Sequence, residues 1–265
     1  MTLKITIMGC GNSSGVPASG NFWGDCDPGE PKNRRFRCSI AVHSEATTIV
    51  IDTGADFRHQ STLFDIIKLD AVFYSHAHSD HTHGIDDLRP FYFKNAQQMI
   101  PCYGSAATMD ELEHRFGFMF EGHTHAPLYP AILSAHKFDP SDYGQLLKFR
   151  DIEYIPFEMD HESCISIGYR FSDLSYCVDV KRLDQKALNC IKGSRIWIID
   201  GSGYHNHENP AHLDFSALYE YNKIVGAQEV YITSLSPFMD YKRVKNEMPE
   251  GFYPAYDGLT FDVDP

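Results

Sequence analysis

Short runs of apolar residues, rich in valine, isoleucine and phenylalanine, recur along the chain between more polar segments. Such runs are typical of buried β-strands. They lie at residues 3–8, 39–44, 48–52, 70–75, 163–171, 175–180, 195–200 and 229–234. Four other segments carry apolar residues at helical spacing, near residues 57–68, 107–116, 182–191 and 214–225. The early strands come in pairs and the later ones alternate with helices, which predicts an α/β fold of two sheets sandwiched between helices.

The length and composition of the chain indicate one domain. Its 265 residues, of which 43% are hydrophobic, are enough for one large buried core but too few for two. We therefore expect a single domain over residues 1–265. Residues 117–150 mix aromatic side chains, proline and glycine with weak periodicity, and they predict an irregular insertion packed near the functional site.

Cysteine content and charge limit the setting and the partners of the protein. The seven cysteines are an odd number without a C-x-x-C pair, which argues against a disulfide framework and favours a reducing cytoplasm. The first residues do not resemble a signal peptide, and no run of about 18 apolar residues predicts a membrane span. The net charge of −13 repels long polyanions, so we expect a small substrate and no extended nucleic-acid surface.

The strongest chemical signal is a histidine-rich run directly after the predicted strand at residues 70–75. It supplies four potential metal ligands, His76, His78, Asp80 and His81. Histidines at i and i+2 can converge on one metal ion, while Asp80 and His81, displaced by a turn, face a second ion beside it. Two ions about 3.5–4 Å apart clamp the attacking and the leaving oxygen of a displacement. The alternative, a polar surface turn, is disfavoured by the position after a buried strand.

This H-x-H-x-D-H run resembles the signature of the metallo-β-lactamase superfamily, whose fold is an αββα sandwich of two mixed sheets flanked by helices. Asp52 resembles the acidic residue that ends an early strand in that family. By the same resemblance, His161 completes the first metal site with His76 and His78, and Asp179 is the carboxylate that bridges both metals. The implied cofactors are two divalent ions, zinc or manganese.

Within the superfamily the chain is most similar to the PhnP-type phosphodiesterases, which act like phosphoribosyl cyclic phosphate phosphodiesterases. The tRNase Z and PqqB branches are more distant. The motifs that carry the similarity are GCGNSSGVP at 9–17, WGDCDP at 23–28, PKNRRFRCS at 31–39, GIDDLR at 84–89 and PAYDG at 254–258. The resemblance implies cleavage of a phosphodiester by a metal-activated water, with a small cyclic phosphate or nucleotide as the substrate.

Two features depart from the PhnP pattern. The loop after the first strand offers only Cys26, so we expect no structural zinc of the kind that a cysteine cluster holds in PhnP-type proteins. The pattern also places a late histidine in the second metal site, whereas here no histidine follows His212 and the matching segment contains Ser234 and Ser236. Three explanations stay open: a serine takes the ligand's place, another residue supplies it, or the second metal is weak or absent.

Two residues are expected to take part in proton transfer. His212 resembles by position a histidine that lies near the phosphate in the tRNase Z branch, so we expect it to protonate the leaving oxygen or to bind phosphate. A capping or surface role is the alternative for His212. Asp80, besides binding metal, is expected to orient the nucleophile.

Other residues are candidates for binding the substrate phosphate. Arg34, Arg35 and Arg37 lie in a loop that the resemblance places at the mouth of the site, and a guanidinium fork matches phosphate oxygens. A basic surface loop paired with nearby carboxylates is the alternative. His205 is a further phosphate candidate, although a surface role fits it as well.

Together these features predict a metal-dependent phosphodiesterase that acts on a small phosphorylated substrate. One alternative is an RNA-processing nuclease like tRNase Z, which the acidic net charge disfavours. Another is a PqqB-like binding or redox protein without hydrolytic activity, which the missing late histidine permits. By analogy with the branch, we expect a homodimer.

Overall fold

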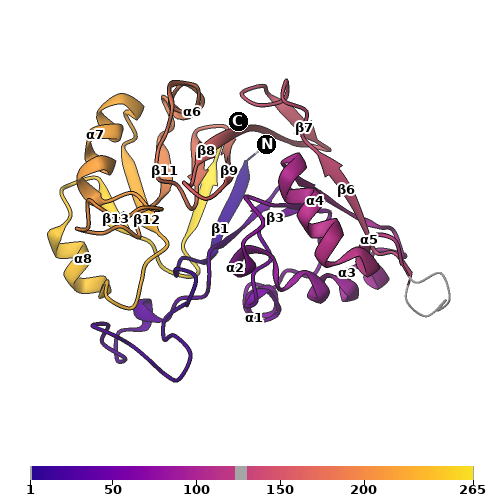
Figure 1. Ribbon diagram of the computed structural model, residues 1–265, viewed down its shortest axis with the longest axis horizontal. Coiled ribbons are helices and arrows are strands. Elements are labelled where there is room, and N and C mark those ends of the chain that lie inside the picture. The colour runs from indigo at the N-terminus through magenta and orange to yellow at the C-terminus, as the bar shows by residue number, and fades with distance from the viewer. Residues whose placement is uncertain (1, 123–129, 265) are drawn as a thin grey trace.

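Two β-sheets packed face to face form the centre of the molecule (Figure 1). The computed structural model describes residues 2–122 and 130–264. The first sheet contains β1 (Leu3–Gly9), β2 (Ser39–His43), β3 (Thr48–Ile51), β4 (Ala71–Phe73), β5 (Ile100–Gly104), β6 (Leu133–Lys137) and β14 (Thr260–Val263). The second contains β7 (Leu147–Phe149), β8 (Ile152–Asp160), β9 (Ile165–Phe171), β10 (Leu174–Cys177), β11 (Ile196–Asp200), β12 (Glu229–Thr233) and β13 (Phe252–Pro254).

Both sheets are mixed, and their strand orders mirror each other. The orders are β14-β1-β2-β3-β4-β5-β6 and β13-β12-β11-β10-β9-β8-β7. Neighbours from β14 to β3 and from β7 to β10 are antiparallel. Neighbours from β3 to β6 and from β10 to β13 are parallel. Each sheet thus has an antiparallel side and a side whose parallel strands require crossover connections.

Helices cover the outer faces of the two sheets (Figure 1). The α-helices are α1 (Phe57–Leu63), α2 (Ser79–Thr82), α3 (Arg89–Lys94), α4 (Ala106–Arg115), α5 (Gly117–Phe120), α6 (Gln185–Ile191), α7 (Phe215–Val225) and α8 (Tyr241–Glu247). Short 3-10 turns lie at Pro31–Asn33 and Ile85–Leu88. Residues at both ends of α7 fix its length. The Asp214 side chain accepts hydrogen bonds from the first amides of the helix, and Gly226 ends the helix with a left-handed backbone (φ 75°). No helix among the described residues is long and apolar enough to cross a membrane.

Aromatic side chains from both sheets interlock in the core between them. Phe73 of β4 lies 4.7 Å from the ring of Tyr154 and 5.5 Å from that of Tyr169, which belong to the opposite sheet. A second apolar cluster, which includes Phe57, Leu88 and Met109, joins the first sheet to its helices. The two sheets packed on each other, with helices packed on their outer faces, confirm the predicted αββα sandwich.

The segment predicted as an irregular insertion is more ordered than expected. Residues 117–150 contribute α5, β6 and β7, although 123–129 lie outside the described residues. Strand β6 lies at one edge of the first sheet and β7 at one edge of the second, so the side chains of both strands are partly exposed. Edge strands carry a weak apolar pattern, which explains why the sequence did not reveal them.

Candidate metal centre

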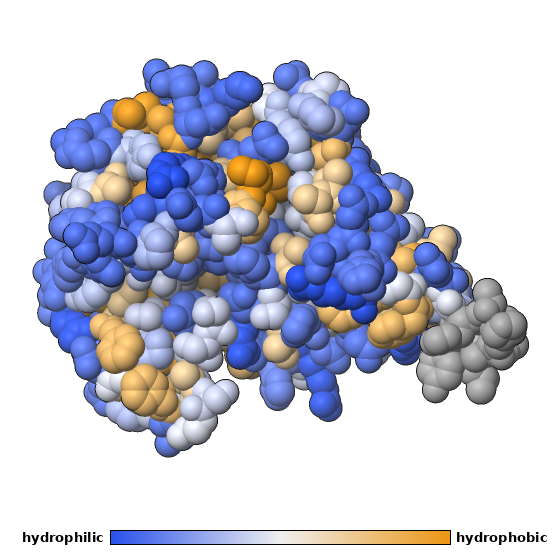
Figure 2. Space-filling view, viewed as in Figure 1, coloured by the Kyte–Doolittle hydropathy of each residue, from blue (hydrophilic) through white to orange (hydrophobic). Residues whose placement is uncertain are grey.

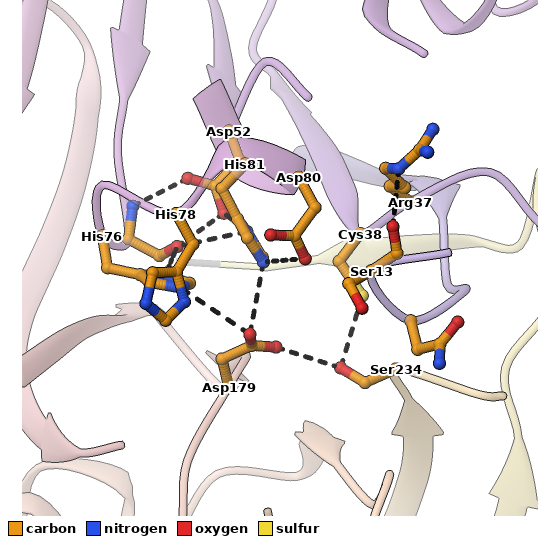
Figure 3. A network of polar contacts seen from close by, with 12 residues as sticks. Ser13, Arg37, Cys38, Asp52, His76, His78, Asp80, His81, Asp179 and Ser234 are labelled. Atoms are coloured by element: carbon orange, nitrogen blue, oxygen red, sulfur yellow. Dashed lines mark hydrogen bonds and ion pairs between the residues drawn. The ribbon is translucent and has the colours of Figure 1, made fainter. Parts of the chain in front are cut away.

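The histidine-rich run lies where β4 meets α2, and its backbone sets the direction of each side chain. His78 is the N-cap of α2 with an extended backbone (φ −62°, ψ 152°), whereas Asp80 and His81 lie within the helical turn. The ring centroids of His76 and His78 are therefore close, 4.5 Å apart. Figure 3 shows these side chains gathered around Asp179, which follows β10 of the other sheet.

The first candidate metal site combines three imidazoles with one carboxylate. Its ligand atoms all lie within 4.8 Å of one another and belong to His76, His78, His161 and Asp179. Oδ2 of Asp179 lies 3.6 Å from Nε2 of His76 and 3.5 Å from Nε2 of His161. Nε2 of His76 is buried and has no hydrogen-bond partner among the described residues. Because a buried nitrogen without a partner is costly and an imidazole is a good metal ligand, this group fits a metal ion.

A second group of ligands shares Asp179 with the first. It consists of Asp80, His81 and Asp179, again with ligand atoms within 4.8 Å. Nε2 of His81 lies 3.3 Å from Oδ2 of Asp80 and 3.4 Å from Oδ2 of Asp179. The structure thus brings together the residues that the sequence assigned to the metal sites, including the two that lie about 80 and 100 residues downstream of the run.

Carboxylates and carbonyls outside the two groups orient the ligand rings. Oδ2 of Asp52 lies 2.7 Å from Nδ1 of His81, and the backbone amide of Ser75 donates to Oδ1 of Asp52 at 2.8 Å. Nδ1 of His161 lies 2.9 Å from the carbonyl oxygen of Ala211. In each case Nδ1 is engaged and Nε2 is left for the metal, as is usual in protein metal sites.

Three residues of the centre lie within two residues of a strand end and have left-handed backbones: Asp52 and Ser234 directly follow β3 and β12, and Asp179 is the second residue after β10. The φ angles are 64° for Asp52, 51° for Asp179 and 58° for Ser234. Side chains other than glycine rarely adopt this region, at a cost of about 1–3 kcal/mol each, and such residues cluster at functional sites. The turn lets each side chain enter the site where its strand ends.

The ligand histidines differ in their tendency to carry a proton. Burial, followed by the charge of His81, holds the pKa of His76 well below its usual range. Burial opposes the charge on His81 too, but Asp52 and Asp179 raise its pKa well above the usual range. Imidazole binds metal in its neutral form, so His76 is ready to bind and a metal ion must displace a proton from His81.

His212 lies at the edge of the centre and is paired with Asp200 at the end of β11. Its Nδ1 is 2.6 Å from Oδ2 of Asp200, and its ring centroid is 5.2 Å from that of His161. Burial lowers the pKa of His212, but the charges of Asp200, Asp179 and Asp80 outweigh burial and raise it to about 9. A proton donor therefore lies beside the two ligand groups.

A cavity of about 260 Å³ joins His212 to the candidate metal ligands. Besides those ligands it is lined by short polar side chains that include Asn12, Ser163 and Ser202. Ser163, Ser202 and Asp200 were not predicted from the sequence, whereas Asn12 lies in the motif at 9–17. Asp200 had a detectable signal, since it ends a predicted strand just as Asp52 does, and the two serines had none.

Arg35 differs from its predicted role. The side chain is buried, and all five guanidinium N–H groups have acceptors. These are the carbonyls of Lys32, Ser236 and Met239, Oδ1 of Asn33 and Sγ of Cys26. Arg35 therefore ties its loop to the segment between β12 and α8 and has no donor for a phosphate, so this prediction was wrong.

Arg34 and Arg37 line a neighbouring cavity of about 590 Å³ rather than the one that contains the metal ligands. The guanidinium of Arg34 lies 4.9 Å from the ring centre of Trp23. Arg37 pairs with Asp56 at 3.1 Å and donates to the carbonyl of Ser13 at 2.8 Å. Figure 3 shows Arg37 on the far side of Ser13 from the ligands. Phosphate binding by these two arginines stays a prediction.

His205 is placed away from the role predicted for it. Its side chain is 61% exposed, and Nε2 lies 3.1 Å from Oε2 of Glu247. It does not line the cavity of the metal ligands. A neighbouring carboxylate repels phosphate, so the structure does not support His205 as a phosphate ligand.

Of the two serines in the segment where the PhnP pattern has a late histidine, Ser234 lies in the metal centre and Ser236 does not. Ser234 is buried, and its Oγ donates to Oδ1 of Asp179 at 3.4 Å. Ser236 instead points its Oγ toward the amide of Phe238. Figure 3 shows Ser234 beside Asp179 and Cys38.

Comparison with known proteins supports the family that this geometry indicates. The family described as "Beta-lactamase superfamily domain" matches residues 47–233. A solved structure described as a new diphosphatase from the PhnP family is 26% identical with a TM-score of 0.87, covering 99% of this chain and 98% of that one.

Two curated relatives match over different lengths. An octanoyltransferase of Porphyromonas gingivalis is 26% identical over 266 residues, which cover 99% of this chain and 52% of that protein. A ribonuclease Z of Methanococcus maripaludis is 22% identical over 147 residues, 54% of this chain and 46% of that protein. The chain thus spans about half the length of the curated relatives it matches. From the family match and the ligand geometry together, the chain belongs to the metallo-β-lactamase superfamily and is similar to its PhnP branch.

Proposed function

We propose that this protein is a hydrolase that cleaves a phosphodiester with two divalent metal ions bound by the ligand groups that share Asp179. The observation that carries the proposal is the shared carboxylate. Oδ2 of Asp179 lies within 3.6 Å of Nε2 of His76, His81 and His161. A shared carboxylate brings two ions side by side, the arrangement suited to in-line displacement at phosphorus. One ion would be held by His76, His78, His161 and Asp179, and the other by Asp80, His81 and Asp179.

When bound, the ions would supply Lewis acidity and a coordinated water of lowered pKa. The remaining steps fall to the chain's own residues. His212, whose Nδ1 is engaged by Asp200, keeps its second ring nitrogen for the leaving oxygen and donates a proton there. Asp80, which lines the same cavity, orients the attacking water. The neutral polar groups of Asn12 and Ser163 can hydrogen-bond the phosphate oxygens.

A small substrate fits this site better than a long one. The cavity volume of about 260 Å³ suits a phosphate with one ring attached. The net charge of −13 repels a polyanion, while a single phosphate has to overcome only the local charge. The PhnP-family neighbour is described as a diphosphatase, which also acts on phosphate linkages. We therefore propose a small cyclic phosphate of a sugar or nucleotide as the substrate class.

A nuclease like the ribonuclease Z relative is the second candidate. It is favoured by the 22% identity over 147 residues. The octanoyltransferase name belongs to a protein of which this chain covers 52%, so we propose no acyl transfer on that ground.

A substrate panel separates these functions. We would supply manganese or zinc to the purified chain and offer a ribose cyclic phosphate, bis(p-nitrophenyl) phosphate, inorganic diphosphate and a precursor tRNA with a 3′ trailer. Hydrolysis of the small diesters without tRNA cleavage is the expected outcome. Cleavage of the tRNA alone would establish the nuclease instead, and no turnover of any substrate would overturn the proposal.

A further inference from the structure

A second cavity lies directly beside the one that contains the metal ligands. Ser163 lines both cavities, and His76 lines the second one as well. The volume of the second cavity is about 590 Å³, whereas that of the first is about 260 Å³. The first cavity is filled by a phosphate with one ring attached. A further ring of the same substrate therefore has room only outside it, and the second cavity provides such room next to Ser163.

The walls of the second cavity are largely apolar and include two aromatic rings. The ring centroids of Phe138 and Tyr143 lie 6.1 Å apart at an angle of 65°. Ile165, at the start of β9, also lines the cavity, and its side chain is 47% exposed. Ala106 and Ala107, at the start of α4, add small exposed side chains. Such walls suit a flat ring, because aromatic and aliphatic side chains pack closely against its faces.

The charged side chains that line this cavity are two carboxylates, Glu111 and Glu158. Glu111 is paired with Arg115 at 2.6 Å. Glu158 is exposed, and its carboxylate has no hydrogen-bond or ion-pair partner within residues 2–122 and 130–264. Burial and then the charge of Glu158 raise the pKa of Tyr143 to about 12, which places the carboxylate near that ring. An unpaired carboxylate repels phosphate and attracts N–H donors.

The arginines of the neighbouring loop belong to a different cavity. Arg34 and Arg37 line the cavity that begins at Ser14, next to Ser13 of the metal cavity. Ser163 belongs to the wall shared with the apolar cavity instead. The two neighbours of the metal cavity thus differ in charge, and the one with Glu158 suits the part of a substrate that carries no phosphate.

We propose that the second cavity binds the base of a nucleotide substrate and that Glu158 selects bases whose edge carries N–H donors. This inference rests on the proposed function and names its substrate class more narrowly. The two oxygens of a carboxylate accept two parallel N–H bonds, which the edge of guanine offers. Uracil presents a carbonyl oxygen on each side of its N–H group, and a carboxylate repels both. Tyr143 and Ile165 would pack against the base.

Steady-state kinetics on three substrates test the preference. The 2′,3′-cyclic phosphates of guanosine and uridine and a ribose cyclic phosphate without a base would be offered to the metal-loaded full-length protein. We expect KM for the guanosine substrate to be about tenfold or more below that of the other two. Equal KM values for the three substrates, or a preference for uridine, would overturn the inference.

A matched pair of variants on β8 tests the role of Glu158. Glu158→Gln keeps the size of the side chain and removes its charge, so KM for the guanosine substrate should rise by about tenfold and that for uridine by less. The change should appear in KM rather than in kcat, because the base binds alike before and during the reaction. Glu153→Gln is the control, since Glu153 is exposed on the same strand and pairs with Lys148 outside the cavity. Equal effects of the two variants would contradict the inference.

A binding measurement without turnover separates this inference from the proposed function. Cys164 lines the cavity and is partly exposed, while Cys190 is partly exposed elsewhere. Guanosine 3′-monophosphate should slow alkylation of Cys164 by iodoacetamide, measured by mass spectrometry, and leave Cys190 unaffected. Inorganic phosphate should not protect Cys164, and equal protection by it would overturn the inference. Protection by the nucleotide without hydrolysis of any diester would instead mean that the proposed function fails while the base site stands.

Discussion

At the residue scale, the site depends on pairs in which an acceptor fixes an imidazole. Asp52 does this for His81, and Asp200 does it for His212. The first pair prepares a metal ligand, and the second prepares a proton donor. Histidine thus serves both as a metal ligand and as a proton donor, and its position relative to Asp179 decides between the two roles.

The leaving group should reveal the role of His212. Because an alkoxide needs a proton to depart and p-nitrophenolate hardly does, His212→Gln should slow hydrolysis of an alkyl phosphodiester by about 100-fold or more. The loss on bis(p-nitrophenyl) phosphate should stay below about tenfold. Rates for the two substrates in wild type and variant are the measurement. Equal losses on both would assign His212 to binding instead.

The pH dependence of stability provides a second check on His212. Its pKa in the folded, metal-free protein is about 9 and lies above the ordinary value of 6.5. The protonated form therefore stabilises the fold fully below about pH 6.5, and this contribution is lost as the pH rises through about 9. In urea denaturation with a chelator present, His212→Gln should lower the free energy of unfolding more at about pH 6 than at about pH 10. A loss independent of pH would contradict the pairing with Asp200.

Residues close together in the sequence were predictable, while those that depend on distant partners were less so. His76 to His81 stood out because their spacing alone indicates a metal site. The prediction that Arg35 binds phosphate failed because a charge pattern does not show whether the N–H groups of a guanidinium already donate to buried carbonyls. Asp200 was missed because its role exists only once β11 brings it to His212.

At the element scale, the ligand turn is held by a loop from the neighbouring strand. The amide of Thr53 donates to the carbonyl of His81 at 2.9 Å, and the amide of Gly84 donates to the carbonyl of Thr53 at 2.8 Å. The loop after β3 and the helix α2 pack so closely that a Cβ on Gly54 would lie 2.0 Å from the carbonyl oxygen of Asp80. Glycine is needed here because two backbones meet.

Gly54→Ala should therefore displace α2 and weaken metal binding. We expect a loss of about 1–3 kcal/mol in the free energy of unfolding, as for other overpacked sites, together with lower metal retention. Gly117→Ala is the matched control, since nothing lies within 4 Å of a Cβ there. Denaturation and metal analysis of both variants are the measurements. A Gly54→Ala protein that retains metal and stability like Gly117→Ala would refute this account of the turn.

Most central strands were predicted, although β5 was not, and the edge strands were missed for a physical reason. Strands such as β4 and β11 are buried along their whole length and leave a clear apolar run. Strands β6, β7 and β13 lie at sheet edges, are short or partly exposed, and in β13 end in a proline. Each of these edge strands is placed by its hydrogen bonds to the adjacent strand, and its own sequence carries little apolar pattern.

At the scale of the whole molecule, the metal centre connects the two sheets. His76 and His78 belong to the first half, whereas His161 and Asp179 follow strands of the second. The one face that the space-filling view shows is largely polar, with smaller apolar patches (Figure 2). Bound metal should therefore act as a link between the halves as well as a reagent.

Removal of metal should lower the thermal stability of the protein. A ligand present at about 100 times its Kd stabilises the folded state by about 2.7 kcal/mol, which corresponds to a Tm shift of about 5–10 °C in a chain of this size. Calorimetry with zinc and with a chelator would measure the shift. Asp179→Ala should respond to zinc far less. An unchanged wild-type Tm would show that metal does not link the halves.

The central claim is a two-metal phosphodiesterase built around Asp179, and one paired measurement tests it most directly. Metal content and hydrolysis of bis(p-nitrophenyl) phosphate would be determined for wild type, Asp179→Ala and Glu220→Ala, the last a control at a carboxylate exposed on α7. With both metals supplied throughout, we predict about two ions per wild-type chain and turnover that is lost in Asp179→Ala but kept in Glu220→Ala. One ion or none without turnover, or turnover that survives Asp179→Ala, would contradict the account.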